Sequence, residues 1–227
     1  MTADELYQQA FHALIAALEA ASLCDEGCGA GTLLAYAQSL AIPTTGIEPD
    51  VAKLAEANRR GLDIRAGTAE ALPFPDGAFD VVTFENSLHH VTEIGRTLAE
   101  AMRVARQAVV IVDPWFDLSI SSQVVGDRFE RWMKALDRMT GMVHRDPIAA
   151  GVIAAACNGS AVTVRHLLQL TPMSNEAFEY FAGRAQPHME TPVYRANGMD
   201  QELSAIRAAF QSTGITEAGA LLVTVLK

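Results

Sequence analysis

A glycine cluster with acidic neighbours is the part of this sequence best suited to chemistry. Residues 25–31 read DEGCGAG and lie between a short apolar run and a helical pattern. Glycines at such a place let the backbone approach a ligand closely, and the following helix presents free N–H groups. These features are typical of a nucleotide-type site in a doubly wound α/β fold. The dinucleotide fingerprint GxGxxG would need a glycine where this chain has Thr32, which argues against a nicotinamide-dependent dehydrogenase.

Three further segments carry polar groups at corresponding places. Glu48 ends an apolar run in GIEPD, and an acid there can accept hydrogen bonds from both hydroxyls of a ribose. Residues 67–74 read GTAEALPF and residues 85–90 read ENSLHH, and each segment follows another apolar run. Because the carboxyl ends of parallel strands meet at one edge of a sheet, we expect a single crevice to collect all four segments.

The elements that must position these residues alternate between strands and helices. The predicted strands are 22–26, 44–48, 62–66, 79–84, 108–113 (stopped by Pro114), 161–170 and 220–226. The predicted helices are 2–21, 32–41, 50–60, 92–105, 126–140, 174–184 and 200–212. A further helix is predicted to begin with Asp146 as its cap and Pro147 at its first position, and to end near Gly159. Residues 186–197 are predicted to be a loop. This alternation predicts an α/β fold built from βαβ units, with helices on both faces of a parallel sheet.

The motifs DEGCGAG, GIEPD, GTAEALPFPDGAFDVV, ENSLHHV and RVARQAVVIVDP resemble those of the S-adenosylmethionine-dependent methyltransferases. Within that superfamily the chain is most similar to small-molecule enzymes of the ubiquinone/menaquinone-biosynthesis type. The resemblance covers residues 22–114. It implies a Rossmann-like, doubly wound, mostly parallel seven-stranded sheet with an antiparallel last strand, an N-terminal helix and a helical lid insertion.

The resemblance also implies S-adenosyl-L-methionine as cofactor, with S-adenosyl-L-homocysteine as product, and roles by position. The methionine moiety would lie against Asp25, Glu26, Gly27, Cys28, Gly29 and Gly31. Glu48 would bind the ribose hydroxyls, Pro49 would lie near the adenine, and Thr68 and Ala69 would face its edge. Glu85 and Asn86 would line the methionine end and the reacting methyl group. Two positions of the site depart from the family pattern: Glu26 replaces an apolar residue, and Thr68 replaces a frequent aspartate. A third departure, Arg106-Gln107 in place of Pro-Gly-Gly before the fifth strand, affects a turn and not the site.

Histidine is the natural general base for an acceptor that must lose a proton. His89 and His90 are the best placed, although either could instead be a residue at the start of a helix whose ring is bonded to backbone. His12, His144, His166 and His188 are more simply explained as surface or core residues. No metal site is expected, because Cys24 and Cys28 lack a second pair and suit buried apolar positions.

The whole chain, 1–227, is expected to be one domain, with an N-terminal helix (1–21), a cofactor-binding half (22–114), a substrate-recognition or lid region (115–197) and a last helix and strand (198–227). The first helix either packs on the core or covers a ligand. Aromatic residues expected in the acceptor pocket are Tyr7, Phe11, Trp115, Phe116 and Trp132.

Composition excludes several other classes. The chain has 227 residues and a net charge of −10, which disfavours nucleic acid and anionic membranes as partners. Three cysteines and an N-terminus with acids before its apolar stretch favour a cytoplasmic protein. We expect it to be a monomer or a homodimer. The predicted function is methyl transfer to a small, apolar or aromatic acceptor. The alternative is a methyltransferase-like protein that binds S-adenosylmethionine or S-adenosylhomocysteine without methylating.

Overall fold

Seven strands form one sheet in the order β3-β2-β1-β4-β5-β7-β6 in the computed structural model, which describes residues 2–157 and 159–227. The strands are β1 (Leu23–Glu26), β2 (Thr44–Glu48), β3 (Ile64–Ala66), β4 (Phe79–Glu85), β5 (Ala105–Trp115), β6 (Ala161–Leu167) and β7 (Gly219–Leu226). Strands β1 to β5 pair in parallel, and β7 runs antiparallel to both β5 and β6. The predicted α/β fold, mostly parallel with an antiparallel last strand, is confirmed.

The chain begins the sheet at its middle and reverses direction there. From β1 it moves outward through β2 to β3, then returns to place β4 on the other side of β1. Loops that leave the carboxyl ends of β1 and β4 therefore diverge, and a crevice opens between them. The glycine cluster follows β1 and the ENSLHH segment follows β4, so both lie at this reversal point.

Helices cover both faces of the sheet. One face carries α4 (Ile94–Val104) and α6 (Ala150–Ala156), and the other carries α1 (Ala3–Ala17), α2 (Thr32–Ser39) and α3 (Val51–Arg59). Because strand side chains alternate, Val109 and Ile111 of β5 pack toward α4, while Val110 packs toward α1. Near-continuous apolar strands are what a sheet buried on both faces requires.

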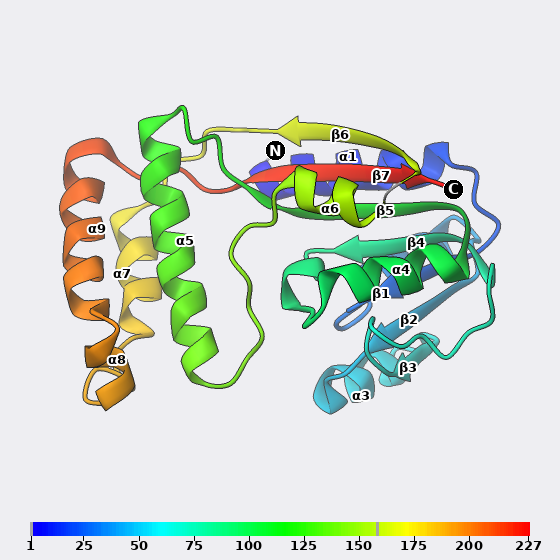
Figure 1. The fold of residues 1–227 in the computed structure, drawn as a ribbon, viewed down its shortest axis with the longest axis horizontal. Coiled ribbons are helices and arrows are strands. Elements are labelled where there is room, and N and C mark those ends of the chain that lie inside the picture. The colour runs from blue at the N-terminus through cyan, green and yellow to red at the C-terminus, as the bar shows by residue number, and fades with distance from the viewer. Residues whose placement is uncertain (1, 158) are drawn as a thin grey trace.

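A second group of helices lies beyond one end of the sheet, on the left of Figure 1. It consists of α5 (Ser121–Met139), α7 (Asn175–Gly183), α8 (Pro192–Ala196) and α9 (Met199–Thr213), which we call the lid. These helices share their own apolar core, in which the rings of Phe129 and Phe178 stack at 4.7 Å. Within the predicted lid region, α6 and β6 instead pack with the sheet, whereas α9 joins the lid.

The structure corrects several predicted boundaries. The helix expected from Asp146 begins only at Ala150, because the Asp146 carboxylate accepts hydrogen bonds from Arg131 and Arg138 of α5 instead of capping a helix. Helix α5 starts at Ser121 rather than at residue 126, and the predicted 186–197 loop contains α8. The segments predicted at 1–21 and up to Gly159 include residues 1 and 158, which lie outside the described residues.

Strand β5 also continues through Pro114, where the sequence predicted its end. Its parallel neighbour β4 stops at Glu85, opposite Val112, so the missing N–H of Pro114 removes no ladder bond on that side. On the other side β7 remains paired out to Trp115. Within the described parts of the chain, no helix is both long enough and apolar enough to cross a membrane.

Candidate functional site

The glycine cluster folds as a tight loop between β1 and α2. The N–H of Gly27 donates to the carbonyl of Ile47 at 2.8 Å, which holds the loop against β2. Gly27 has φ +68°, and a Cβ atom there would stand 2.7 Å from Cβ of Ser87, in the segment after β4. Only glycine fits both the backbone conformation and this close approach. The loop therefore brings the ends of β1, β2 and β4 together.

Glu48, at the end of β2, is held in place by two backbone N–H groups. Its Oε2 accepts from Gly29 at 2.8 Å, and its Oε1 accepts from Asp50 at 2.9 Å. The residue is only 4% exposed, yet it lines a pocket. Each carboxylate oxygen has further lone pairs, so Glu48 can still accept hydrogen bonds from a ligand. The side chain is therefore oriented before any ligand arrives.

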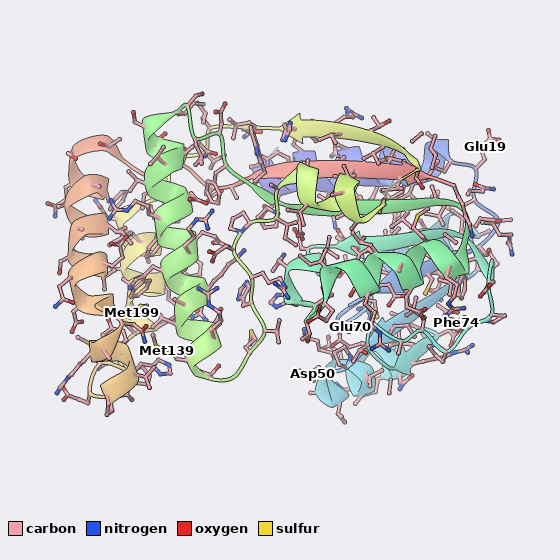
Figure 2. The ribbon with its side chains drawn as sticks, in the orientation of Figure 1. Glu19, Asp50, Glu70, Phe74, Met139 and Met199 are labelled. Atoms are coloured by element: carbon pink, nitrogen blue, oxygen red, sulfur yellow. The ribbon has the colours of Figure 1, made fainter. Side chains whose placement is uncertain are left out.

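The pocket beside Glu48 has a volume of about 570 Å³, within the range of small-molecule sites. Figure 2 shows Asp50 and Glu70, two of its residues, on the side of the sheet that faces the lid, away from Phe74 and Glu19. The predicted cofactor residues that line it are Glu26, Gly27, Glu48, Pro49, Thr68, Ala69 and Asn86. The structure therefore brings together most of the set that the sequence singled out.

A second cavity, of about 360 Å³, lies between α1 and the ends of β4, β5 and β7. Tyr7 and Phe11 of α1 line it, as does Glu85, and all three were predicted site residues. Asn86 lines both cavities and has φ +51°, a left-handed conformation that asparagine tolerates better than most residues. The two cavities therefore adjoin at Asn86.

Buried and half-buried carboxyl groups lie around the junction of the cavities. Burial raises the pKa of Asp25 well above its usual range, and the nearby acids Glu85, Glu26 and Glu48 raise this pKa further. A 2.9 Å hydrogen bond from the Thr83 hydroxyl to the Asp25 carboxylate acts in the opposite direction. Burial likewise raises the pKa of Glu26 to about 8 and raises that of Glu85. Such a concentration of acids is costly without a positive partner, and it favours a cationic ligand.

Four other predicted residues lie beside this site rather than in the lining of either cavity. Asp25 is 2% exposed and points along the sheet toward Thr83 of β4. Cys28 is buried behind the loop, close to Gly46 of β2. Gly29 and Gly31 shape the loop, with φ +57° and +83°.

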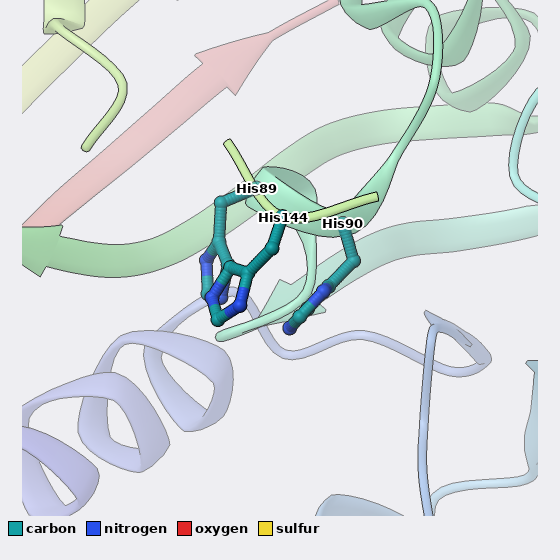
Figure 3. Close-up of side chains that lie close together, drawn as sticks. All are labelled: His89, His90 and His144. Carbon is teal, nitrogen blue, oxygen red and sulfur yellow. The ribbon is translucent and has the colours of Figure 1, made fainter. Parts of the chain in front are cut away.

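Three histidines meet beside the larger pocket, as Figure 3 shows. His89 and His90 form the short helix η1 (Leu88–His90) after β4, and His144 lies in the segment between α5 and α6. Nδ1 of His89 lies 2.8 Å from Oδ1 of Asp113, Nδ1 of His90 lies 2.9 Å from the carbonyl of Val143, and Nδ1 of His144 lies 2.8 Å from Oδ2 of Asp137.

The sequence did not predict that His144 joins the other two. His90 and Val143 are 53 residues apart in the chain, and no periodic pattern connects them. Burial lowers the pKa of His144 to about 4 and lowers the pKa of His90, so burial disfavours the charged form of both rings. His90 also lines the larger pocket, which places the cluster at the edge of the site.

The aromatic residues predicted for the acceptor pocket separate in the structure. Trp115 is half-buried at the end of β5, with its ring 4.3 Å from that of His166. Phe116 is 7% exposed and packs on Gly126 of α5. Trp132 was placed wrongly: it is a core residue of the lid, 2% exposed, and its Nε1 donates to the carbonyl of Met199 at 3.1 Å. A satisfied indole in an apolar core has no surface to offer a ligand.

Comparison with known proteins agrees with this geometry. Residues 24–112 match the family described as "Methyltransferase domain". The "Uncharacterized methyltransferase YcgJ" of Bacillus subtilis is 34% identical over 91 residues, covering 37% of this chain and 36% of that protein. The crystal structure of YcgJ covers 97% of this chain and 98% of its own, with a TM-score of 0.64 and 18% identity, and shows the same fold.

Two other relatives share shorter parts. The "Ajmaline N-methyltransferase" of Rauvolfia serpentina is 32% identical over 127 residues, covering 51% of this chain and 44% of the relative. The "Ubiquinone/menaquinone biosynthesis C-methyltransferase UbiE" of Methylobacterium nodulans is 54% identical over 43 residues, covering 19% and 17%. The matches thus span less than half the length of each of these three relatives. Residues 24–112 thus match the methyltransferase-domain family, and the glycine loop, the oriented Glu48 and the sheet order agree with the Rossmann-like fold of the solved methyltransferase structure.

Proposed function

We propose that this protein binds S-adenosylmethionine in the larger pocket and transfers its methyl group to a small organic acceptor. The observation that carries the proposal is Glu48, whose carboxylate is fixed by Gly29 and Asp50 at the mouth of a cavity of suitable size. A buried acid in this place matches a vicinal diol, because its two oxygens can each accept one hydroxyl hydrogen.

The charge distribution supports the same cofactor. When bound, S-adenosylmethionine supplies an electrophilic methyl group on a cationic sulfonium. Asp25 and Glu26 are buried and Glu85 is half-buried around the junction of the two cavities, and all three lack a basic partner among their described hydrogen bonds and ion pairs. A cation there would relieve their mutual repulsion. The residues present therefore fit the group.

The chain's own residues divide the remaining work by position. Thr68 and Ala69 line the pocket beyond Glu48, where they would face the adenine. Asn86 lies where the cavities adjoin, so it would lie near the reacting groups. The smaller cavity, with Tyr7 and Phe11, would hold the acceptor. Holding an acceptor in line can contribute ~7–11 kcal/mol to lowering the barrier, so positioning alone supports catalysis here.

A methyl-transfer assay tests this function. The purified protein is incubated with S-adenosylmethionine labelled in its methyl group and with a panel of small phenols, amines and carbon acids, and products are separated and identified by mass spectrometry. The proposal predicts label in at least one acceptor together with S-adenosylhomocysteine. Tight binding of the cofactor without transfer to any acceptor would favour the alternative, a binding protein without methylation activity, and absence of binding would refute both.

A further inference from the structure

His89, His90 and His144 form a group that the proposed methyl transfer does not explain. One ring nitrogen of each lies within 4.8 Å of one ring nitrogen of the other two. Figure 3 shows the rings gathered side by side, two from η1 and one from the segment that follows α5. The rings pack on one another, with centroids 4.4 Å apart for His89 and His90, 5.2 Å for His89 and His144 and 4.4 Å for His90 and His144, and they would repel one another if they were charged.

Hydrogen bonds hold each ring in a defined orientation. The Nδ1 atoms of all three histidines already have partners, namely the carboxylates of Asp113 and Asp137 and the carbonyl of Val143. In a neutral imidazole, an Nδ1–H donated to such an acceptor leaves the lone pair of Nε2 free to bind a ligand. Metal-binding histidines show this arrangement, in which the second ring nitrogen donates to a carboxylate or a backbone carbonyl.

The segment that carries His144 is also anchored to η1. The N–H of Arg145 donates to the carbonyl of His89 at 2.8 Å, and its Nε donates to the carbonyl of Val91 at 2.8 Å. With the bond between His90 and Val143, these contacts flank His144 on both sides. The position of His144 against η1 is therefore built by the fold.

Buried groups without hydrogen-bond partners lie around the cluster. Oδ2 of Asp113 and Nζ of Lys134 are both in this state, and both act electrostatically on His90. Lys134 disfavours a cation, but its Nζ is 3.3 Å from Glu130, and Arg184 pairs with Asp137. The carboxylates of Asp113, Glu130, Asp137 and Asp146 are balanced by Lys134, Arg138, Arg145 and Arg184, so the case for a metal rests on the three imidazoles and not on net charge.

We propose that His89, His90 and His144 bind a divalent transition-metal ion, with Zn²⁺ the best match, at the edge of the cofactor pocket. Imidazole nitrogen is a preferred ligand of Zn²⁺, and a site with three histidines leaves a fourth position open. Tetrahedral Zn²⁺ with bonds of ~2.0–2.1 Å needs nitrogens ~3.3 Å apart. Because the nitrogens lie within 4.8 Å of one another, each pair would have to approach by at most ~1.5 Å.

Because His90 lines the cofactor pocket, the open position would adjoin it. If the proposed methyl transfer holds, the open position of this metal would face the bound cofactor, whereas the acceptor would lie in the smaller cavity. That consequence rests on the proposed function, whereas metal binding itself does not. The test below therefore uses no S-adenosylmethionine, and the two proposals can fail separately.

The test is titration of the chelator-treated protein with Co²⁺, followed by visible absorption, and with Zn²⁺, followed by calorimetry. We expect one ion per chain and the intense absorption of four-coordinate Co²⁺. His144→Ala should weaken Zn²⁺ binding by at least ~100-fold, and Asp137→Asn, which keeps all three imidazoles, by ~10–100-fold. His166→Ala, at an exposed histidine on β6, is the matched control and should bind as the wild type does.

Thermal unfolding of each variant separates loss of the site from loss of the fold. If His144→Ala does not fold, His144→Gln removes the imidazole with a smaller change in volume. Equal Zn²⁺ affinity in the wild type and in His144→Ala, or no stoichiometric binding by the wild type, would overturn the proposal. Stabilisation by inorganic phosphate without stabilisation by Zn²⁺ would identify an anion site and would overturn it as well.

Discussion

The Oε2 atom of Glu48 accepts a hydrogen bond from the backbone N–H of Gly29 at 2.8 Å, which joins the end of β2 to the loop after β1. The bond links the two motifs that carry most of the cofactor assignment. It also means that the ribose-binding acid and the glycine loop are positioned together. A change at either residue should therefore affect the whole larger pocket.

Replacement of Glu48 by alanine removes the predicted acceptors of the ribose hydroxyls. Hydrogen bonds to a charged group contribute about 1.5–3 kcal/mol each, so the affinity for S-adenosylmethionine should fall at least ~10-fold. Glu56→Ala, at an exposed position of α3, is the control and should leave affinity unchanged. Calorimetric titration measures both. Equal dissociation constants for Glu48→Ala and the wild type would remove Glu48 from the site.

Gly27→Ala tests the close approach between the loop and the segment after β4. An alanine at φ +68° costs about 1–2 kcal/mol in backbone strain, and its Cβ would stand 2.7 Å from that of Ser87. We expect a lower melting temperature and weaker cofactor binding. Gly95→Ala in α4 has open space around its Cβ and serves as the control. A Gly27→Ala protein with wild-type stability and affinity would contradict the described loop.

The raised pKa of Glu26 makes stability depend on pH in a defined direction. Burial raises this pKa from 4.5 to about 8, so the folded protein holds a proton that the unfolded chain releases between these values. The stability that this proton contributes is therefore fully present below the pKa of Glu26 in the unfolded chain, and it is lost as the pH rises through this window.

Glu26→Gln removes that titration and can keep the contact with Sγ of Cys24. The difference in unfolding free energy, variant minus wild type, should increase from pH 5 to pH 8 by up to a few kcal/mol and should then stay constant. Urea unfolding across this range measures the gap, with exposed Glu56→Gln as the control. A gap that does not change with pH would show that Glu26 does not titrate there.

The corrected position of Trp132 gives a prediction for the lid. Trp132→Phe removes the hydrogen bond to the carbonyl of Met199 and should lower the unfolding free energy by about 1–3 kcal/mol. Cofactor affinity should stay the same, because Trp132 is in the lid core. Tyr180→Phe, at a ring that is 73% exposed, should change neither quantity. Loss of cofactor affinity in Trp132→Phe but not in Tyr180→Phe would show that Trp132 contributes to the pocket.

The cofactor-binding half could be predicted from the sequence because its signals are local. The apolar run before Asp25, the glycines after it and the acid at Glu48 each specify a piece of backbone. Once strands and helices alternate, the rules for parallel sheets place the strand ends at one edge. The sheet order and the assembly of Glu26, Gly27 and Glu48 around one pocket follow from these rules.

The lid and the histidine cluster could not be predicted in this way. Trp132 has the same spacing signal whether it lines a pocket or fills a core, and only the partners on α9 decide. Asp146 and Pro147 look like a helix start, but the arginines of α5 compete for the carboxylate. His144 reaches η1 only because the segment after α5 folds back through Arg145. The Thr191 cap with Pro192 at the first position of α8 was a usable signal for the missed helix.

The most direct measurement of the central claim is calorimetric titration of the wild-type protein with S-adenosylmethionine, S-adenosylhomocysteine and NAD under identical conditions. We predict saturable binding of the first two at one site per chain and no binding of NAD. No binding of S-adenosylmethionine or S-adenosylhomocysteine by folded protein, or binding of NAD in their place, would contradict the assignment of the larger pocket.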